Sequence, residues 1–157
     1  MKKLFSRVLV VLALGLAFGR LPVAAANPPE DVDQSITIPA GGGCAFGVEI
    51  VLSGKGKTIE LPGARLILTS PGLDATLTNL DDPSKQVTLN ITGAFHQTTK
   101  QDGSVVTVST GRSLLLDPQA GFVLAIGHFS FVFDAGGNLI QALAGKGRLI
   151  DACALIA

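Results

Sequence analysis

Short runs of alternating apolar and polar residues follow one another along most of the chain, separated by turn residues. In the run 86–99, Val87, Leu89, Ile91 and Phe95 share one parity, while threonine, asparagine and His96 occupy the other. A period of two is typical of a β-strand with one buried face. No stretch shows helical apolar spacing over three turns. The pattern therefore predicts an all-β domain.

Turn signals divide these runs into strands. Pro-Gly at 62–63 and 71–72, DDPSK at 81–85 and Asp-Gly at 102–103 each predict a turn, and SGKGK at 53–57 is interpreted as a hairpin turn. Successive hairpins predict one antiparallel arrangement of about nine or ten strands, folded into a β-sandwich or a closed β-barrel. The strand order stays open between a meander and a Greek key.

The apolar stretch 121–133 changes parity in its middle. Phe122, Leu124 and Ile126 occupy even positions, whereas the three phenylalanines that follow occupy odd ones. A β-bulge at Gly127-His128 would bring both sets to one face, and this is the favoured interpretation. The alternative is a central strand that is covered on both faces.

The first 26 residues have the build of a secretory signal. Three cations at positions 2, 3 and 7 precede an apolar run at 8–18 and three alanines at 24–26. That run is shorter than the roughly 20 apolar residues that a membrane span needs. We expect a signal peptide over 1–26, cleavage near Ala26, a secreted, extracellular product and no stable membrane anchor. Residues 27–43 are predicted to form an exposed leader, in which the alternation of Ile36 and Ile38 leaves open one short edge strand, and 44–157 a single all-β domain.

Cleavage of the signal changes the charge balance. Four of the twelve basic residues lie in 1–26 and no acidic ones do, so eight basic groups remain against twelve acidic ones, a net charge of minus four. The remaining lysines and arginines are scattered singly along the sequence, which is not the pattern of a nucleic-acid-binding protein. The partner and the oligomeric state are left open.

The two cysteines, Cys44 and Cys153, lie near opposite ends of the predicted domain. In an oxidising, exported setting an isolated pair is expected to form a disulfide. It would close a loop of 109 residues, for which the chain-entropy relation gives about 4.7 kcal/mol of stabilisation. We expect this disulfide to join the first and last strands.

Few residues could carry chemistry. His96 lies on the polar face of its strand, and no serine or free cysteine stands in a nucleophile motif beside it. His96 and His128 are 32 residues apart, unlike the local spacing of most zinc ligands. Glu49 and Glu60 are the carboxylate pair to test for glycosidic cleavage. The sequence predicts no catalytic residue, no metal site and no cofactor.

Two functions remain open. The first is a non-catalytic β-domain that acts in binding or at the cell surface. The alternative is a closed barrel that binds or transforms a small apolar ligand among its phenylalanines, with His96 or Arg112 at the mouth. His96 and Arg112 are therefore the predicted ligand-binding residues.

Several runs of this chain resemble a group of small, secreted bacterial proteins with no assigned activity. The similar runs are TSPGLDATLTNL, VTLNITGAFHQTT, DGS, TGRSLLLDP and FVFDAGGNL, within a region that reaches from Cys44 to the final Cys-Ala-Leu. The resemblance implies an exported all-β domain with a terminal disulfide. It implies no catalytic residue, and proteins of this group often have GRF where this chain has Gly127-His128-Phe129.

Overall fold

The structure is a computed structural model that describes residues 28–157, and in this range it contains nine β-strands and no helix. The all-β prediction is confirmed, and the predicted signal peptide lies outside the described residues. The strands are β1 (Glu30–Ile38), β2 (Val48–Leu61), β3 (Arg65–Thr69), β4 (Asp74–Asn79), β5 (Gln86–Asn90), β6 (Gly93–Thr99), β7 (Val105–Asp117), β8 (Gly121–Phe133) and β9 (Leu139–Asp151).

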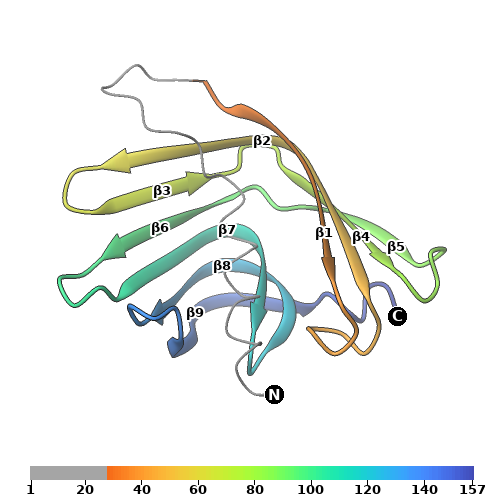
Figure 1. Cartoon of the computed structure of the whole chain (residues 1–157). Coiled ribbons are helices and arrows are strands. Elements are labelled where there is room, and N and C mark those ends of the chain that lie inside the picture. The colour runs from red at the N-terminus through yellow and green to blue at the C-terminus, as the bar shows by residue number, and fades with distance from the viewer. Residues whose placement is uncertain (1–27) are drawn as a thin grey trace.

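All pairings are antiparallel, and β1 pairs with β2, β6 with β7, β7 with β8 and β8 with β9 (Figure 1). β3 and β4 both pair with β2, and are halves of one long strand interrupted at residues 70–73. β5 pairs with β4, and β6 pairs with β3, so β5 and β6 are likewise two halves of one longer strand. The sheet is thus a meander from β1 to β9. It is not closed, because β1 pairs only with β2 and β9 only with β8, so the prediction of a closed barrel is wrong.

The predicted hairpin at SGKGK is also wrong, because β2 continues through this segment as one strand of 14 residues. Gly54 has φ of 136°, and a Cβ atom there would lie 2.3 Å from the carbonyl oxygen of Gly72. The glycine permits a bend and a close approach between two strands rather than a reversal. The chain reverses later, between β2 and β3, at Pro62-Gly63-Ala64, where Ala64 also has positive φ.

A row of paired glycines crosses four strands of the sheet. Gly93 of β6 pairs with Gly111 of β7, Gly111 with Gly127 of β8, and Gly127 with Gly147 of β9. We call these four residues the glycine row. A Cβ atom on any of them would lie within 3.0 Å of the backbone of the next strand. β7 and β8 bend sharply along this line (Figure 1).

Beyond the glycine row, the second half of β7 folds back toward β9. The carboxylate of Asp117, at the end of β7, accepts a hydrogen bond from the backbone N–H of Leu143 in β9 at 3.2 Å. Without the bend, two residues so far apart along the β7–β8–β9 path could not meet. The second halves of β7 and β8 therefore form an inner layer.

This inner layer explains the change of parity in β8. Phe122, Val123, Leu124 and Ala125 are each at most 3% exposed, so both faces of the strand are covered. The pairing of β7 with β8 runs without interruption through Gly127 and His128, and the irregular pairs with β9 lie later, between Ser130 and Phe133. The predicted bulge is wrong, and the alternative of a strand covered on both faces is correct for residues 122–125, whereas His128 is exposed.

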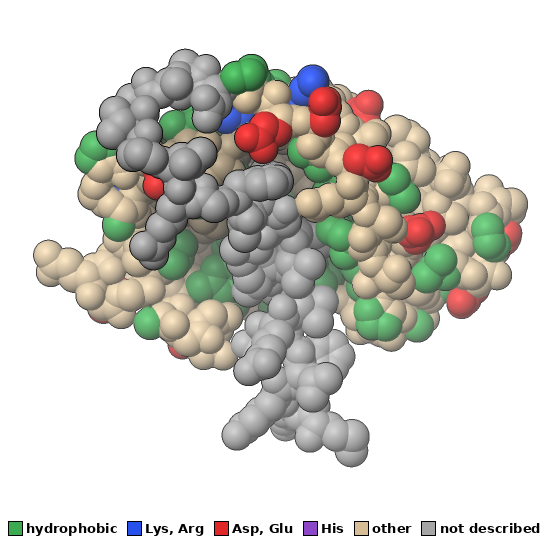
Figure 2. All heavy atoms as spheres, turned by 45° about the horizontal axis from the view of Figure 1, so that its top comes forward, with side chains coloured by type: hydrophobic (Ala, Val, Ile, Leu, Met, Phe, Trp, Pro, Cys, Tyr) green, Lys and Arg blue, Asp and Glu red, His purple; other side chains and the backbone are tan. Residues whose placement is uncertain are grey.

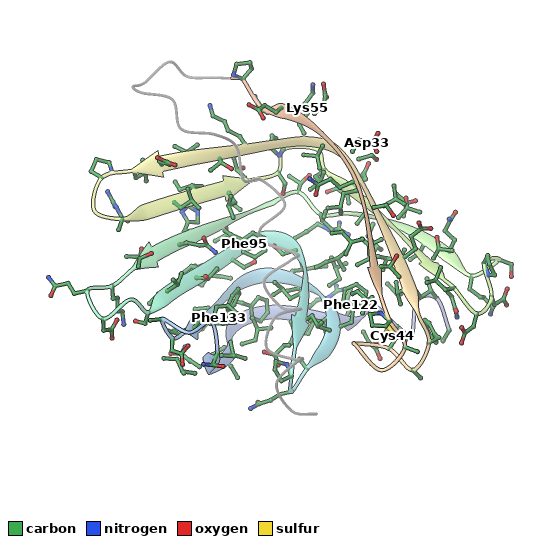
Figure 3. The ribbon with its side chains drawn as sticks, in the orientation of Figure 1. Asp33, Cys44, Lys55, Phe95, Phe122 and Phe133 are labelled. Atoms are coloured by element: carbon green, nitrogen blue, oxygen red, sulfur yellow. A yellow bond between two sulfur atoms is a disulfide. The ribbon has the colours of Figure 1, made fainter. Side chains whose placement is uncertain are left out.

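The main hydrophobic core lies between β1, β2, β4 and β5 on one side and the second halves of β7 and β8 on the other. Figure 3 shows Phe122 near Cys44 in this region. Each large apolar side chain buried here contributes about 1.5–3 kcal/mol. The core comprises Val32, Ile38, Cys44, Val48, Ile50, Leu52, Leu73, Ala75, Leu77, Leu89, Ile91, Leu114, Phe122, Leu124, Ala152 and Ile156.

The Cys44–Cys153 disulfide is present, with Cα atoms 5.5 Å apart. It joins the loop before β2 to the segment after β9, rather than the first and last strands themselves. The C-terminal segment is also held at the β4–β5 hairpin. The side-chain amide of Asn79 donates to the carbonyl oxygen of Ile156, and the amino group of Lys85 to that of Ala157, each at 3.0 Å.

The prediction of an exposed leader over 27–43 needs correction for residues 30–38. These residues form β1, which pairs with β2 over nine positions. Val32 and Ile38 are buried in the core, so the sheet begins before Cys44. The alternation of Ile36 and Ile38 predicted one short edge strand within this leader, and the structure extends that strand to nine residues. No helix within residues 28–157 is long and apolar enough to cross a membrane.

Candidate ligand-binding surface

His96 lies on β6, opposite Ile67 of β3 and Val108 of β7, with an exposed side chain. These direct cross-strand neighbours are apolar and offer neither a nucleophile nor a group to orient the imidazole. No group of three or more histidine, cysteine or acidic side chains in residues 28–157 could hold a metal ion. His96 is thus a solvent-exposed polar side chain between two apolar cross-strand neighbours.

Arg112, the other predicted ligand-binding residue, lies just beyond the glycine row on β7. Its backbone N–H donates to the carbonyl oxygen of Thr92 at 3.0 Å, and its side chain is half-buried. The guanidinium Nε is buried and has no hydrogen-bond partner. His96 is opposite Val108, four residues before Arg112 and across the bend. The structure does not bring the two predicted residues together.

Arg112 instead belongs to a different group of basic side chains. In one row across the sheet, Arg112 pairs with Ile126, and Ile126 pairs with Arg148 of β9. In the row on the other side of the glycines, Thr110 pairs with His128, and His128 with Lys146. We call these two rows the cationic rows. Directly paired residues project from the same face of a sheet, with strands about 4.8 Å apart, so the side chains within each row lie close together.

The cationic rows have no acidic residue among them. The ion pair between Lys55 and Asp31 is the single one found within the described part of the chain, and it lies elsewhere. Arg112, Lys146 and Arg148 are three of the eight strong cations that follow residue 26. Uncompensated cations concentrated on one part of an acidic domain create a local positive potential.

The cationic rows end at a free sheet edge. β9 pairs only with β8, and every residue from Ala144 to Leu149 is exposed. Two large apolar side chains on this strand also face solvent, Ile140 at 61% and Leu149 at 45% exposure. An edge strand presents unpaired backbone N–H and C=O groups, which can pair with another extended chain. This edge and the cationic rows together form the candidate surface.

Other candidate chemistry is not assembled by the fold. Glu49 and Glu60 lie eleven residues apart on the same strand, β2, and the Glu49 carboxylate accepts a hydrogen bond from the Ser35 hydroxyl at 3.0 Å. At roughly 3.3 Å per residue this separation far exceeds that of two glycosidase carboxylates. The pair cannot flank one glycosidic bond.

Three aspartates in hairpin turns have pKa values below their ordinary 3.8, because turn residues hydrogen-bond to the ionised carboxylates. The largest cause in each case is a hydrogen bond from the side chain of Ser84, Ser104 or Asn138 to Asp82, Asp102 or Asp134, respectively. Backbone N–H groups of the same partners add to the effect. These carboxylates organise turns.

Sequence reasoning identified Arg112 and missed Lys146 and Arg148. A signal was present, since KGR at 146–148 places two cations on one face of a strand with glycine between them. Their proximity to Arg112 depends on pairing between β7, β8 and β9, which the sequence pattern did not specify. Comparison of the chain with protein-family models, with curated proteins and with solved structures gave no match.

Proposed function

We propose that this chain is an exported, non-catalytic β-domain that acts by binding, and that its ligand is an acidic, extended polypeptide segment. The observation that carries the proposal is the combination of uncompensated cations and a free edge at β9. The cations of the two rows attract acidic side chains, and the edge offers backbone hydrogen bonds. Strand addition of this kind is an established mode of peptide recognition.

Each part of the surface has a separate role in this proposal. Lys146 and Arg148 lie on the edge strand itself, where they would face alternate side chains of an added strand. Arg112 lies two strands away in the row of Arg148, beyond Ile126, which packs against the core. Its side chain is half-buried and its Nε is buried, so in this proposal Arg112 adds positive charge near the edge and does not contact the peptide through Nε. His128 occupies the same position in the row of Lys146.

The proposal includes secretion and a two-layer arrangement. Export is supported by the build of residues 1–26 and by the disulfide, which is typical of an oxidising compartment. We further propose that β1, β2, β4 and β5 and the second halves of β7 and β8 act as the two layers of a sandwich. In that arrangement the layers bury the core and leave β9 at the side as a docking edge.

A peptide-binding measurement tests the proposal. The secreted protein is titrated against a fluorescent peptide of alternating aspartate and threonine, and against the same peptide with lysine in place of aspartate. Anisotropy should rise with the acidic peptide alone, and the affinity should fall as salt is added, because exposed charges are screened. Equal binding of both peptides, or of neither, would contradict the proposal.

A matched pair of variants locates the surface. Arg148→Glu reverses a charge on the edge strand, and we expect it to weaken binding of the acidic peptide by about tenfold or more. Lys100→Glu makes the same charge change in the turn between β6 and β7 and should leave the affinity within about twofold of the unmodified protein. A loss that is equal in the two variants would indicate an effect of net charge rather than a site at β9.

A further inference from the structure

We infer that the acidic segment is the edge strand β1 of a second copy of this chain, so that copies associate head to tail through β1 and β9. This inference rests on the proposed function, because it names the partner of the same surface. In the described structure β1, β5 and β9 each have a single strand beside them, and β5 (Gln86–Asn90) carries no charged side chain, so β1 and β9 are the charged edges.

β1 has the charge opposite to that of β9. Glu30, Asp31 and Asp33 are all exposed, and Figure 3 shows Asp33 and Lys55 on the outer side of β1 and β2. Lys55 pairs with Asp31 at 2.6 Å, but the two side chains are 52% and 85% exposed, so the pair is solvated and leaves the other two carboxylates uncompensated. Figure 2 shows acidic side chains in red gathered on the upper part of the surface, with few basic ones in blue.

The spacing of the charges also matches. Asp31 and Asp33 alternate along β1 and project from its outer face, as their buried neighbour Val32 projects toward the core. Lys146 and Arg148 have the same separation of two residues on β9. One register between two strands therefore brings both aspartates opposite both cations, and places Val32 opposite Gly147.

The charges favour this head-to-tail contact over symmetric ones. Pairing of β9 with β9 would place Lys146 and Arg148 of two copies together, and pairing of β1 with β1 would do the same with the aspartates. Contact between β1 and β9 uses different surfaces on the two copies and leaves one free edge at each end. Such a contact can repeat and produces a series of oligomers rather than a single closed dimer.

Charges on an edge strand can have the opposite role. Lysine at a sheet edge is one of the devices by which proteins prevent edge-to-edge pairing. If Lys146 and Arg148 protect β9 in this way, their removal should increase association, whereas the head-to-tail contact requires that their reversal abolish it. The two roles predict opposite results for the same variant.

Sedimentation velocity over a range of concentrations at low salt tests the inference. We expect the secreted protein to form oligomers whose size rises with concentration and falls with added salt. Asp31→Lys with Asp33→Lys should lower the association constant by about tenfold or more, and Lys146→Asp with Arg148→Asp should do the same. An equimolar mixture of the two double variants should associate again, because each then presents the charge that the other requires.

The outcomes separate this inference from the proposed function. The Asp31→Lys, Asp33→Lys protein keeps the β9 surface and should still bind the acidic peptide; if its fold is disturbed through the Lys55 contact, Asp33→Lys alone replaces it. A protein that binds the acidic peptide but stays monomeric at all concentrations overturns head-to-tail association and leaves the proposed function intact. Increased association of the Lys146→Asp, Arg148→Asp protein alone would also overturn it.

Discussion

The hydroxyl groups of Ser109 and Ser113 lie 2.9 Å apart, although the two residues are four positions apart on the same β-strand. In an extended strand their Cα atoms would be separated by about 13 Å. Both residues are buried, at 2% and 3% exposure, and Gly111 lies between them. The contact therefore records how sharply β7 folds at the glycine row. This hydrogen bond joins the segments of β7 that lie on either side of Gly111.

This contact predicts a coupled effect on stability. Ser109→Ala should lower the free energy of unfolding by about 1–3 kcal/mol, because it leaves the Ser113 hydroxyl buried without its partner. Ser113→Ala should do the same. The double variant should lose less than the sum of the two single losses, as measured by urea unfolding in a double-mutant cycle. Strictly additive losses would show that the two hydroxyls do not stabilise each other.

Gly111 predicts a second, larger effect. Its φ is 85°, and a Cβ atom would lie 2.9 Å from the carbonyl oxygen of Thr92, so Gly111→Ala combines an unfavourable backbone conformation with overlap. We expect a loss of about 3 kcal/mol or more. Gly121 is the matched control, with φ of 78° and no atom within 4 Å of the added Cβ. Gly121→Ala should cost only about 1 kcal/mol in the same thermal or urea measurement. Similar losses for both would show that overlap at Gly111 contributes little.

The Cys44–Cys153 disulfide predicts a dependence of stability on redox conditions. Its removal in Cys44→Ala with Cys153→Ala should lower the free energy of unfolding by about 2–5 kcal/mol, because it frees a loop of 109 residues in the unfolded chain. Reduced and oxidised samples of the unmodified protein should differ by a similar amount in urea unfolding. Two free thiols in the secreted protein, found by mass analysis under non-reducing conditions, would contradict the pairing.

Asp134 predicts how acid affects the hairpin between β8 and β9. Hydrogen bonds from the Asn138 side chain and then from its backbone N–H lower the pKa of Asp134 below 3.8. The stabilisation from this carboxylate is therefore fully present above its unfolded-state pKa and is lost as pH falls through the lower, folded-state pKa. Carboxyl NMR titration should show the lowered pKa, and Asn138→Ala should raise it. An unchanged Asp134 pKa in that variant would rule out the Asn138 side chain as the main cause.

The alternation of apolar and polar side chains predicted where strands occur, but it did not predict which glycines lie inside a strand and which lie in a turn. The apolar positions of 86–99 predicted a strand with one inner face, and Leu89 and Ile91 are buried as expected. The same kind of reasoning failed at SGKGK, because glycines that permit a bend look like glycines that form a turn. Gly54 has its role only because Gly72, in the segment between β3 and β4, lies against it.

The candidate surface, too, was predicted from the sequence in part only. Arg112 was identified from the sequence, but Arg148 and Lys146 join it only through the register of β7, β8 and β9. His96 was identified for the same reason as Arg112, and the register places apolar residues beside it instead. A residue type suggests a chemistry, whereas cross-strand pairing determines which side chains can act together.

The sequence by itself determined the all-β class, the antiparallel hairpins and the disulfide, because these depend on local periodicity, short turns and a single pair of cysteines. Only the tertiary structure decided that the sheet stays open, that β1 is part of it, and that β7 folds back on itself at Gly111. Those features depend on contacts between residues far apart in the chain, such as Gly111 with Gly127, whose positions are set by strand register rather than by local sequence.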